Sequence, residues 1–198
     1  MIRDFHLADL LTLANGGSGT AALFLAMDHV REARVDKLYA AGACVVAALV
    51  FDVMDGRVAR WRHHASPLGR ELDSLADVIS FGVAPAGLAF AAGMTGLWDA
   101  LCLVYFVACG ISRLARYNVT AEAMSAQTGK VTYFEGTPIP TSVLLVALLL
   151  GLARAGRIED AMLAGVWRIA GFDLHPLALV FVLSGSLMIS KTLRIPKP

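Results

Sequence analysis

The apolar residues of this chain are gathered in six long blocks rather than in the narrow stripes of a soluble helix. With 57% hydrophobic residues and a mean hydropathy of +0.65, the chain is too apolar for an ordinary soluble domain. The blocks, each long enough or nearly so to cross a bilayer as a helix, cover residues 7–27, 38–54, 72–94, 97–115, 138–153 and 174–189. We therefore predict an all-α polytopic membrane protein with six transmembrane helices. No repeat or long linker divides the chain, so we expect a single membrane domain over residues 1–198.

The distribution of positive charge predicts how these helices are oriented. The N-terminus lacks the positive region and the small-residue cleavage site of a secretory signal, so we expect the first block to remain as a span. With the N-terminus in the cytoplasm, eleven of the 17 Lys and Arg residues fall inside. The six outside are Arg31, Arg34, Lys37, Arg154, Arg157 and Arg168. Because cytoplasmic loops carry an excess of Lys and Arg, this count favours a cell inner membrane protein with both termini in the cytoplasm.

Four aspartates stand at the facing ends of the second and third blocks. Asp52 and Asp55 are three residues apart, and Asp73 and Asp77 are four apart, so each pair lies on one face of its predicted helix. The short link 61–65 allows the two faces to converge, in a cavity that opens to the cytoplasm. Two unit charges about 4 Å apart repel by roughly 4 kcal/mol at an effective dielectric near 20, so these carboxylates predict bound cations. Oxygen ligands without histidine or cysteine suit Mg²⁺ or Mn²⁺, and paired ions of this kind are used in phosphoryl transfer.

Residues around the acids fit a phosphate-bearing ligand. Gly56 and Gly69 place no side chain on the acidic faces, so a nucleotide or diphosphate can lie close to the backbone. Ser66 and Pro67 are typical of a helix start, with a hydroxyl for the N-cap and proline in the first turn. Further along, the segment 81–85 ends in proline and should bend or loosen the third helix.

Other small or polar residues are assigned to structure. The small residues of the segment 15–19 favour close helix packing. The three cysteines match no metal motif and are interpreted as buried small hydrophobes. The histidine pair 63–64 is interpreted as part of a solvated link, and the connection 154–173 as an interfacial helix on the outer face.

The two acidic segments also carry a longer pattern with fixed spacing. It reads Asp52-x2-Asp55-Gly56-x2-Ala59-Arg60-x8-Gly69-x3-Asp73-x3-Asp77. The pattern matches, without a gap or substitution, the signature of the CDP-alcohol phosphatidyltransferase family. The segments 72–85, 113–118 and 134–140 are similar to one subgroup, the CDP-diacylglycerol–serine O-phosphatidyltransferases or phosphatidylserine synthases. The resemblance covers about residues 7–145.

The resemblance implies a membrane enzyme, usually a homodimer, that transfers the phosphatidyl group of CDP-diacylglycerol to L-serine and releases CMP. It implies two divalent ions, Mg²⁺ or Mn²⁺. The metal ligands map to Asp52, Asp55, Asp73 and Asp77. Asp77 is also implied as the general base. The CDP-lipid site maps to Gly56, Ala59, Arg60 and Gly69.

Recognition of serine requires a cation for its carboxylate. Arg113 and Arg116 lie in the segment shared with the subgroup, and a planar guanidinium suits a carboxylate. The same two residues suit the anchoring of lipid headgroups at the cytoplasmic surface equally well. Asn118 and Glu135 are candidates for binding the serine ammonium group or for ordering the loop.

Rival functions follow from the same residues. The acceptor could be another alcohol, such as glycerol 3-phosphate or an inositol phosphate, although the segment 113–118 favours serine. The donor could be an archaeal CDP-lipid, because the lipid tails are contacted by apolar groups alone. A non-enzymatic alternative is an ion or proton transporter, which is disfavoured because the acids sit at one end of the bilayer. We expect no nucleic-acid partner.

Overall fold

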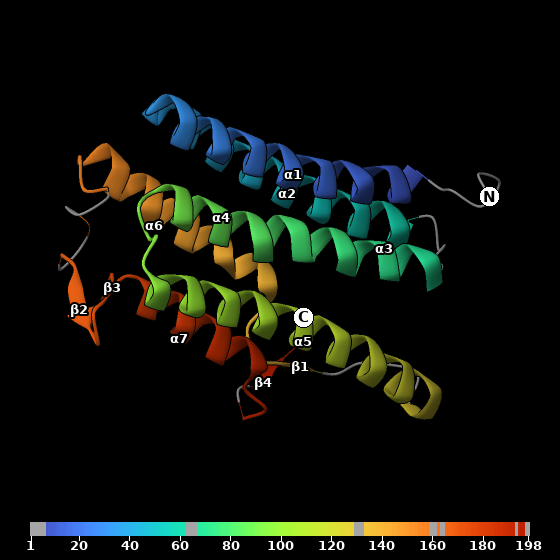
Figure 1. Ribbon diagram of the computed structural model, residues 1–198. Coiled ribbons are helices and arrows are strands. Elements are labelled where there is room, and N and C mark those ends of the chain that lie inside the picture. The colour runs from blue at the N-terminus through green and yellow to red at the C-terminus, as the bar shows by residue number, and fades with distance from the viewer. Residues whose placement is uncertain are drawn as a thin grey trace.

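Long helices lying side by side form most of the protein, seen in a computed structural model (Figure 1). The structure describes residues 7–61, 67–128, 133–158, 162, 165–192 and 194–196. The α-helices are α1 (Leu7–Glu32), α2 (Val35–Trp61), α3 (Pro67–Asp77), α4 (Ala84–Ala91), α5 (Leu97–Thr128), α6 (Val143–Arg154) and α7 (Ala178–Ile189). The other elements are a π-helix η1 (Val78–Val83), a 3₁₀-helix η2 (Ile139–Ser142), and the strands β1 (Tyr133–Glu135), β2 (Trp167–Ile169), β3 (Phe172–Leu174) and β4 (Arg194–Pro196).

The membrane character predicted from the sequence is confirmed. The helical segments long and apolar enough to cross a bilayer are Ala8–Glu32, Val35–Val58, Leu68–Ala91 and Leu97–Thr120. They correspond to the first four apolar blocks. The last two blocks form the shorter apolar helices Ile139–Arg154 and Ala178–Ile189. Six complete crossings and a cavity facing the cytoplasm stay predictions.

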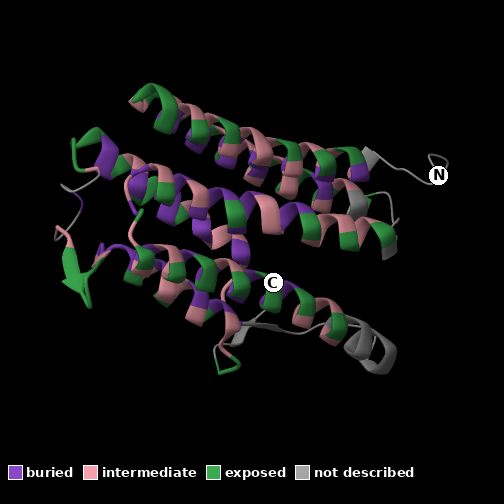
Figure 2. Ribbon diagram, in the orientation of Figure 1, coloured by how far each residue is buried: buried purple, intermediate pink, exposed green. Residues whose placement is uncertain are grey.

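The helices pack through small residues. Buried alanines, Ala22 and Ala26 in α1 and Ala41 and Ala48 in α2, allow close contact between helices where lipid removes the usual hydrophobic drive. Figure 2 shows buried residues concentrated where helices face one another, with exposed residues turned outward. The α3–η1–α4 rod packs against α1, while α5 pairs with α7 (Figure 1). This arrangement places α1 beside both acidic helices.

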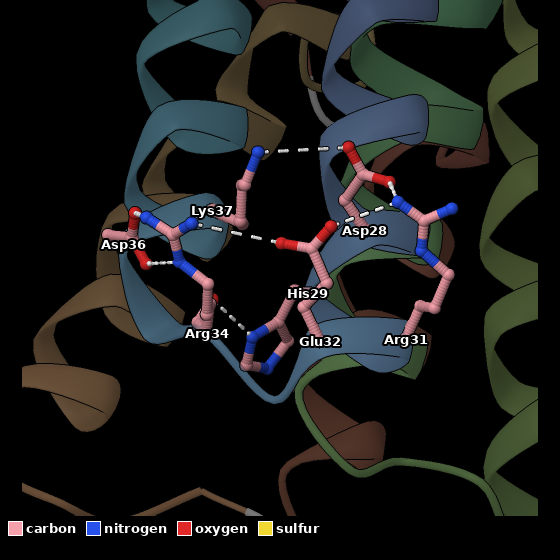
Figure 3. A network of polar contacts seen from close by, with 7 residues as sticks. All are labelled: Asp28, His29, Arg31, Glu32, Arg34, Asp36 and Lys37. Carbon is pink, nitrogen blue, oxygen red and sulfur yellow. Dashed lines mark hydrogen bonds and ion pairs between the residues drawn. The ribbon is translucent and has the colours of Figure 1, made fainter.

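A network of charged residues holds the turn between α1 and α2 (Figure 3). Its members are Asp28, His29, Arg31, Glu32, Arg34, Asp36 and Lys37. Ala33 has φ 52°, and His29 Nδ1 donates to the Arg34 carbonyl oxygen at 2.8 Å. The shortest ion pair joins Arg34 to Asp36 at 2.6 Å. Because these pairs are largely exposed and screened by solvent, their main effect is to compensate charge at this end of the bundle.

A π-helix interrupts the rod directly after Asp77. Proline has no backbone N–H, so Pro85 cannot complete the regular hydrogen-bond ladder of an α-helix. The backbone over Val78–Val83 adopts the wider i→i+5 pattern just before it. The predicted loosening at residues 81–85 is therefore confirmed, and it begins three residues earlier than the sequence indicated.

The connection before α7 contains a β-hairpin, so the prediction of an interfacial helix over 154–173 is wrong for its last part. Strands β2 and β3 pair antiparallel, with Trp167 opposite Leu174. Ala170 and Gly171 form the turn, and both have positive φ, 51° and 85°. Positive φ at both central residues is the type I′ geometry that matches the twist of a hairpin. Since alanine rarely adopts this conformation, the turn has little signal in the sequence.

A buried hydrogen-bonded pair, Asp99 and His175, fastens this hairpin to α5. Asp99 and His175 are both buried, and His175 Nδ1 donates to Asp99 Oδ2 at 2.7 Å. The same carboxylate accepts the backbone N–H of His175 at 2.7 Å and that of Gly96 at 3.1 Å. Nearby, Trp98 Nε1 donates to the carbonyl oxygen of Ile169 at 3.0 Å. Asp99 therefore joins the start of α5 to the segment that leads into α7.

A second pair of strands brings distant segments together. Strand β1, which precedes the fifth apolar block, pairs antiparallel with β4 near the end of the chain. Next to β1, Gly136 has φ 72° and packs against the Met188 carbonyl group, where a Cβ atom would not fit. Thr137 N donates to the Leu187 carbonyl oxygen at 3.2 Å. These contacts hold the entry to η2 against the end of α7.

We predict that Asp99→Ala destabilises the protein. The substitution leaves buried donors of His175 and Gly96 without an acceptor, which should lower the free energy of unfolding by roughly 1–3 kcal/mol. The measurement is the thermal unfolding midpoint in detergent. Arg168→Ala is the control, because its 3.1 Å pair with Asp173 is exposed and should contribute less than about 1 kcal/mol. Equal midpoints for both variants would contradict the prediction.

Candidate functional site

Three of the four predicted aspartates converge. Asp52 and Asp55 come from α2 and Asp73 from α3, and one carboxylate oxygen of each lies within 4.8 Å of the others. At an effective dielectric near 20, each ionised pair at this distance repels by about 3–4 kcal/mol. The Asp73 Oδ1 atom is also buried without a hydrogen-bond partner among the described residues. A carboxylate oxygen with no hydrogen-bond partner, in a group of oxygen ligands, suits a hard cation such as Mg²⁺ or Mn²⁺.

Asp77 lies one helical turn beyond Asp73 and borders this cluster. It is buried, and it interacts electrostatically with Asp52 and Asp73. One of its oxygens, Oδ1, accepts a hydrogen bond from Asn15 Nδ2 at 3.1 Å. Asp77 is therefore beside the three clustered carboxylates and is held from a different helix.

Helix α1 supplies polar contacts to both acidic helices. Thr12 Oγ1 donates to Asp55 Oδ2 at 2.7 Å, and Asn15 contacts Asp77. Asp9, one turn before Thr12, is buried, and its carboxylate repels the like charge of Asp55. The sequence interpretation missed these roles. The available signal was the spacing of residues 9, 12 and 15, which places polar side chains on one side of an otherwise apolar span.

The small residues of α1 allow this close approach. A Cβ atom at Gly16 would lie 3.4 Å from the Ala76 Cβ atom, and one at Gly19 would run into Ser80. The predicted packing role of the segment 15–19 is confirmed at these two glycines. Because α1 lies so close to α3 and η1, short side chains such as Asn15 can reach the acids.

The residues expected around the CDP-lipid lie next to the acids on both helices. Gly56 is next to Asp55 on α2, and Gly69 lies one turn before Asp73 on α3; both are partly buried. The backbone of α2 continues through Ala59 and Arg60, whose side chains lie outside the described residues. The link 62–66 lies outside them too, including the histidine pair 63–64.

Arg113 is a buried, positively charged residue whose chemistry suits an anionic substrate group. It is only 7% exposed, and it interacts electrostatically with Asp77. Its guanidinium lies 5.7 Å from the centre of the Tyr117 ring, within cation–π range. Its Nε atom has no hydrogen-bond partner among the described side chains and backbone. Arg113 thus places an incompletely paired positive charge beside the acidic site.

The other residues predicted to bind serine have different surroundings. Asn118 Nδ2 donates to Ser74 Oγ at 3.0 Å and lies 3.5 Å from both carboxylate oxygens of Glu71, so it joins α5 to α3. Arg116 Nη1 donates to the Ile189 carbonyl oxygen at 3.1 Å, at the end of α7. The backbone of Glu135 belongs to β1, and its side chain lies outside the described residues.

Comparison with known proteins decides the family. The family model for CDP-alcohol phosphatidyltransferases matches residues 5–184, which include both acidic helices and the segment around Arg113. The chain belongs to the CDP-alcohol phosphatidyltransferase family. The resemblance found in the sequence is confirmed.

Curated members of the family are similar over much of the chain. A CDP-diacylglycerol–serine O-phosphatidyltransferase of Saccharomyces cerevisiae is 43% identical over 201 residues, covering 100% of this chain and 73% of that protein. An archaetidylserine synthase of Methanothermobacter thermautotrophicus is 38% identical, covering 71% of this chain and 56% of that protein. A CDP-diacylglycerol–serine O-phosphatidyltransferase of Helicobacter pylori is 41% identical, covering 65% and 53%. This chain therefore spans about half the length of the last two relatives.

Membership of the family agrees with the chemistry of the cluster. Enzymes of the CDP-alcohol phosphatidyltransferase family generally use a divalent metal, and Asp52, Asp55 and Asp73 form a donor set suited to one. The acids also lie together, in the last part of α2 and in α3, which follows it after a short link. A row of acids through the bilayer, which an ion pathway needs, is not what the described residues form.

We predict that Asp52→Asn weakens Mn²⁺ binding by at least about tenfold, since removal of a charged ligand exceeds the 10–100-fold effects known for outer contacts. Binding can be measured by the loss of the free Mn²⁺ signal in electron paramagnetic resonance. Asp36→Asn is the control, because Asp36 lies at the other end of α2 in the exposed network of Figure 3. Unchanged Mn²⁺ affinity in Asp52→Asn would show that the cluster is not the metal site.

Proposed function

We propose that this protein transfers the phosphatidyl group of CDP-diacylglycerol to the hydroxyl of L-serine, forming phosphatidylserine and CMP. One observation carries the proposal. A relative that aligns with the entire chain, at 43% identity, is a CDP-diacylglycerol–serine O-phosphatidyltransferase. The convergence of Asp52, Asp55 and Asp73 supports it, because the acids needed for metal-assisted phosphoryl transfer are brought together.

The reaction is a direct displacement at phosphorus. The serine hydroxyl gives its proton to the Asp77 carboxylate and attacks the phosphorus that bears diacylglycerol. A serine–phosphorus ester bond forms as the bond from that phosphorus to the bridging oxygen breaks, and CMP leaves with the electron pair. Divalent ions held by Asp52, Asp55 and Asp73 would neutralise the diphosphate and favour departure of CMP, while Asp77, one turn beyond Asp73, acts as the base. Asp77 afterwards releases its proton to water.

The protein surrounds the two substrates from different helices. The CDP part of the lipid lies against the helix faces that carry the acids, next to Gly56, Ala59, Arg60 and Gly69. Glycine permits close approach of a diphosphate to the backbone. The diacylglycerol tails and the product stay in the membrane, while CMP departs to water. An opening toward the cytoplasm, with the N-terminus on that side, serves both destinations.

Arg113 is proposed to bind the serine carboxylate. Its buried guanidinium has an open Nε donor and lies within electrostatic reach of Asp77. A carboxylate bound there would bring the neighbouring serine hydroxyl toward the base. Asn118 lies on the same helix at its contact with α3 and is proposed to meet the ammonium group. Arg116 and Glu135 are secondary candidates for the same substrate.

Two further features belong to the proposal. We place the protein in the cell inner membrane, because eleven of its positive residues lie on the predicted cytoplasmic side. We also propose that it forms a homodimer, as is usual in the family. A second candidate donor is the corresponding archaeal CDP-lipid, because an archaetidylserine synthase is 38% identical over 71% of this chain. Lipid tails are contacted by apolar groups, so the polar site described above suits either donor.

We expect purified protein with Mn²⁺ or Mg²⁺ and CDP-diacylglycerol to release CMP only when serine is added, with label from serine entering lipid. Glycerol 3-phosphate and inositol phosphate are the comparison acceptors. An equal rate with glycerol 3-phosphate would overturn the choice of acceptor. Metal flux across proteoliposomes without CMP release would favour a transporter instead.

We predict that Arg113→Gln raises the KM for serine by at least about tenfold, since a charged hydrogen bond worth 1.5–3 kcal/mol is lost. The KM for CDP-diacylglycerol should change less than about threefold. Arg154→Ala serves as the matched control, because Arg154 is exposed at the end of α6. A rise in both KM values together would indicate general damage to the site rather than loss of a carboxylate ligand.

A further inference from the structure

We propose that Asn15, held in place by Ser80, positions the Asp77 carboxylate for proton transfer. The inference rests on the proposed function, since it assigns a role toward the base of that reaction. Asn15 itself is a positioning residue: it acts through Asp77. Neither the family pattern of acids nor the sequence interpretation gives it this role.

The contact between Asn15 and Asp77 fixes one oxygen of the base. Asn15 is fully buried on α1, and its Nδ2 atom donates to Asp77 Oδ1 at 3.1 Å. A carboxylate on a two-bond side chain can turn about its last bond. An amide donor at Oδ1 restricts this turn and leaves Oδ2 as the oxygen for the serine hydroxyl. The plane of the carboxylate, and with it the position of Oδ2, is then fixed.

Asn15 is in turn fixed by the helix segment that follows Asp77. Ser80 Oγ donates to the backbone oxygen of Asn15 at 2.9 Å. Ser80 lies in η1, three residues after Asp77. Asp77 therefore contacts the side chain of Asn15, and Ser80 contacts its backbone oxygen. Gly19 permits this contact, because a Cβ atom there would lie 2.6 Å from the Ser80 Cα atom. These contacts together set the distance between α1 and Asp77.

The cost of burying Asn15 argues for a functional role. Its Oδ1 atom is buried and has no hydrogen-bond partner among the described residues. An unpaired buried carbonyl is destabilising, and leucine would fill a similar volume without that cost. Packing alone would therefore favour an apolar residue at this position. What asparagine adds is the N–H that Asp77 accepts.

Thr12 provides an internal comparison on the same helix. It lies three residues before Asn15 and donates to Asp55, a member of the three-carboxylate cluster, at 2.7 Å. Asn15 donates instead to Asp77, which lies outside that cluster. Loss of the Thr12 contact should act on metal affinity, and loss of the Asn15 contact on the proton-transfer step. The two substitutions are thus expected to have opposite signatures.

The experiment compares Asn15→Leu, Asn15→Gln and Thr12→Val in the purified full chain. We measure kcat, both KM values, Mn²⁺ affinity by electron paramagnetic resonance, and the thermal midpoint. Asn15→Leu should lower kcat by about 10–100-fold, the range for lost outer contacts, with Mn²⁺ affinity changed less than about threefold. Asn15→Gln, which keeps a donor on a longer side chain, should recover part of kcat. Thr12→Val should weaken Mn²⁺ binding by about 10–100-fold.

Each other outcome overturns the inference. If Asn15→Leu keeps kcat within about twofold of the unaltered protein, the contact does not position the base. If it loses Mn²⁺ affinity to the same extent as Thr12→Val, Asn15 acts on the metal site. If kcat, metal affinity and thermal midpoint fall together, its role is packing. Absence of serine-dependent CMP release from the unaltered protein would instead reject the proposed function, which separates the two failures.

Discussion

Mutual repulsion among carboxylates is the constraint on which the rest of this structure depends. Asp52, Asp55 and Asp73 bring oxygens within 4.8 Å of one another inside an apolar bundle, and Asp77 borders them. Such a group is stable only if positive charge and hydrogen-bond donors compensate it. Metal ions supply the larger part in the proposed function. The chain supplies the remainder through Thr12, Asn15 and the buried Arg113.

Those donors can act only because the helices approach closely. Gly16 and Gly19 let α1 contact α3 and η1, which brings a threonine and an asparagine within hydrogen-bond distance of the acids. A larger residue at Gly19 would push α1 away from Ser80. Packing and chemistry therefore share the same residues in α1. The π-helix after Asp77 contributes by presenting Ser80 toward the same helix.

Sequence reasoning predicted the acidic site well because helical spacing is a local property. The intervals of three and four residues placed each pair of aspartates on one face, and the short link allowed the faces to meet. The contacts of Thr12 and Asn15 depend on how α1 is rotated against two other helices, which no local pattern specifies. The hairpin at Trp167–Leu174 was missed for a different reason. Its turn is built on Ala170 and Gly171, and a left-handed alanine has no recognisable sequence signal.

The pairing of β1 with β4 has a consequence for the order in which the protein assembles. During synthesis, the segment before the fifth apolar block leaves the ribosome well before its partner strand at Arg194–Pro196. The Leu187 and Ile189 carbonyl groups that hold Thr137 and Arg116 also arrive late. The early helices can meet around the aspartates first, as an incomplete half-site. Arg116 on α5 can therefore make its contact with α7 only after the chain has been synthesised through Ile189, so this part of α5 is fixed later than the aspartate cluster.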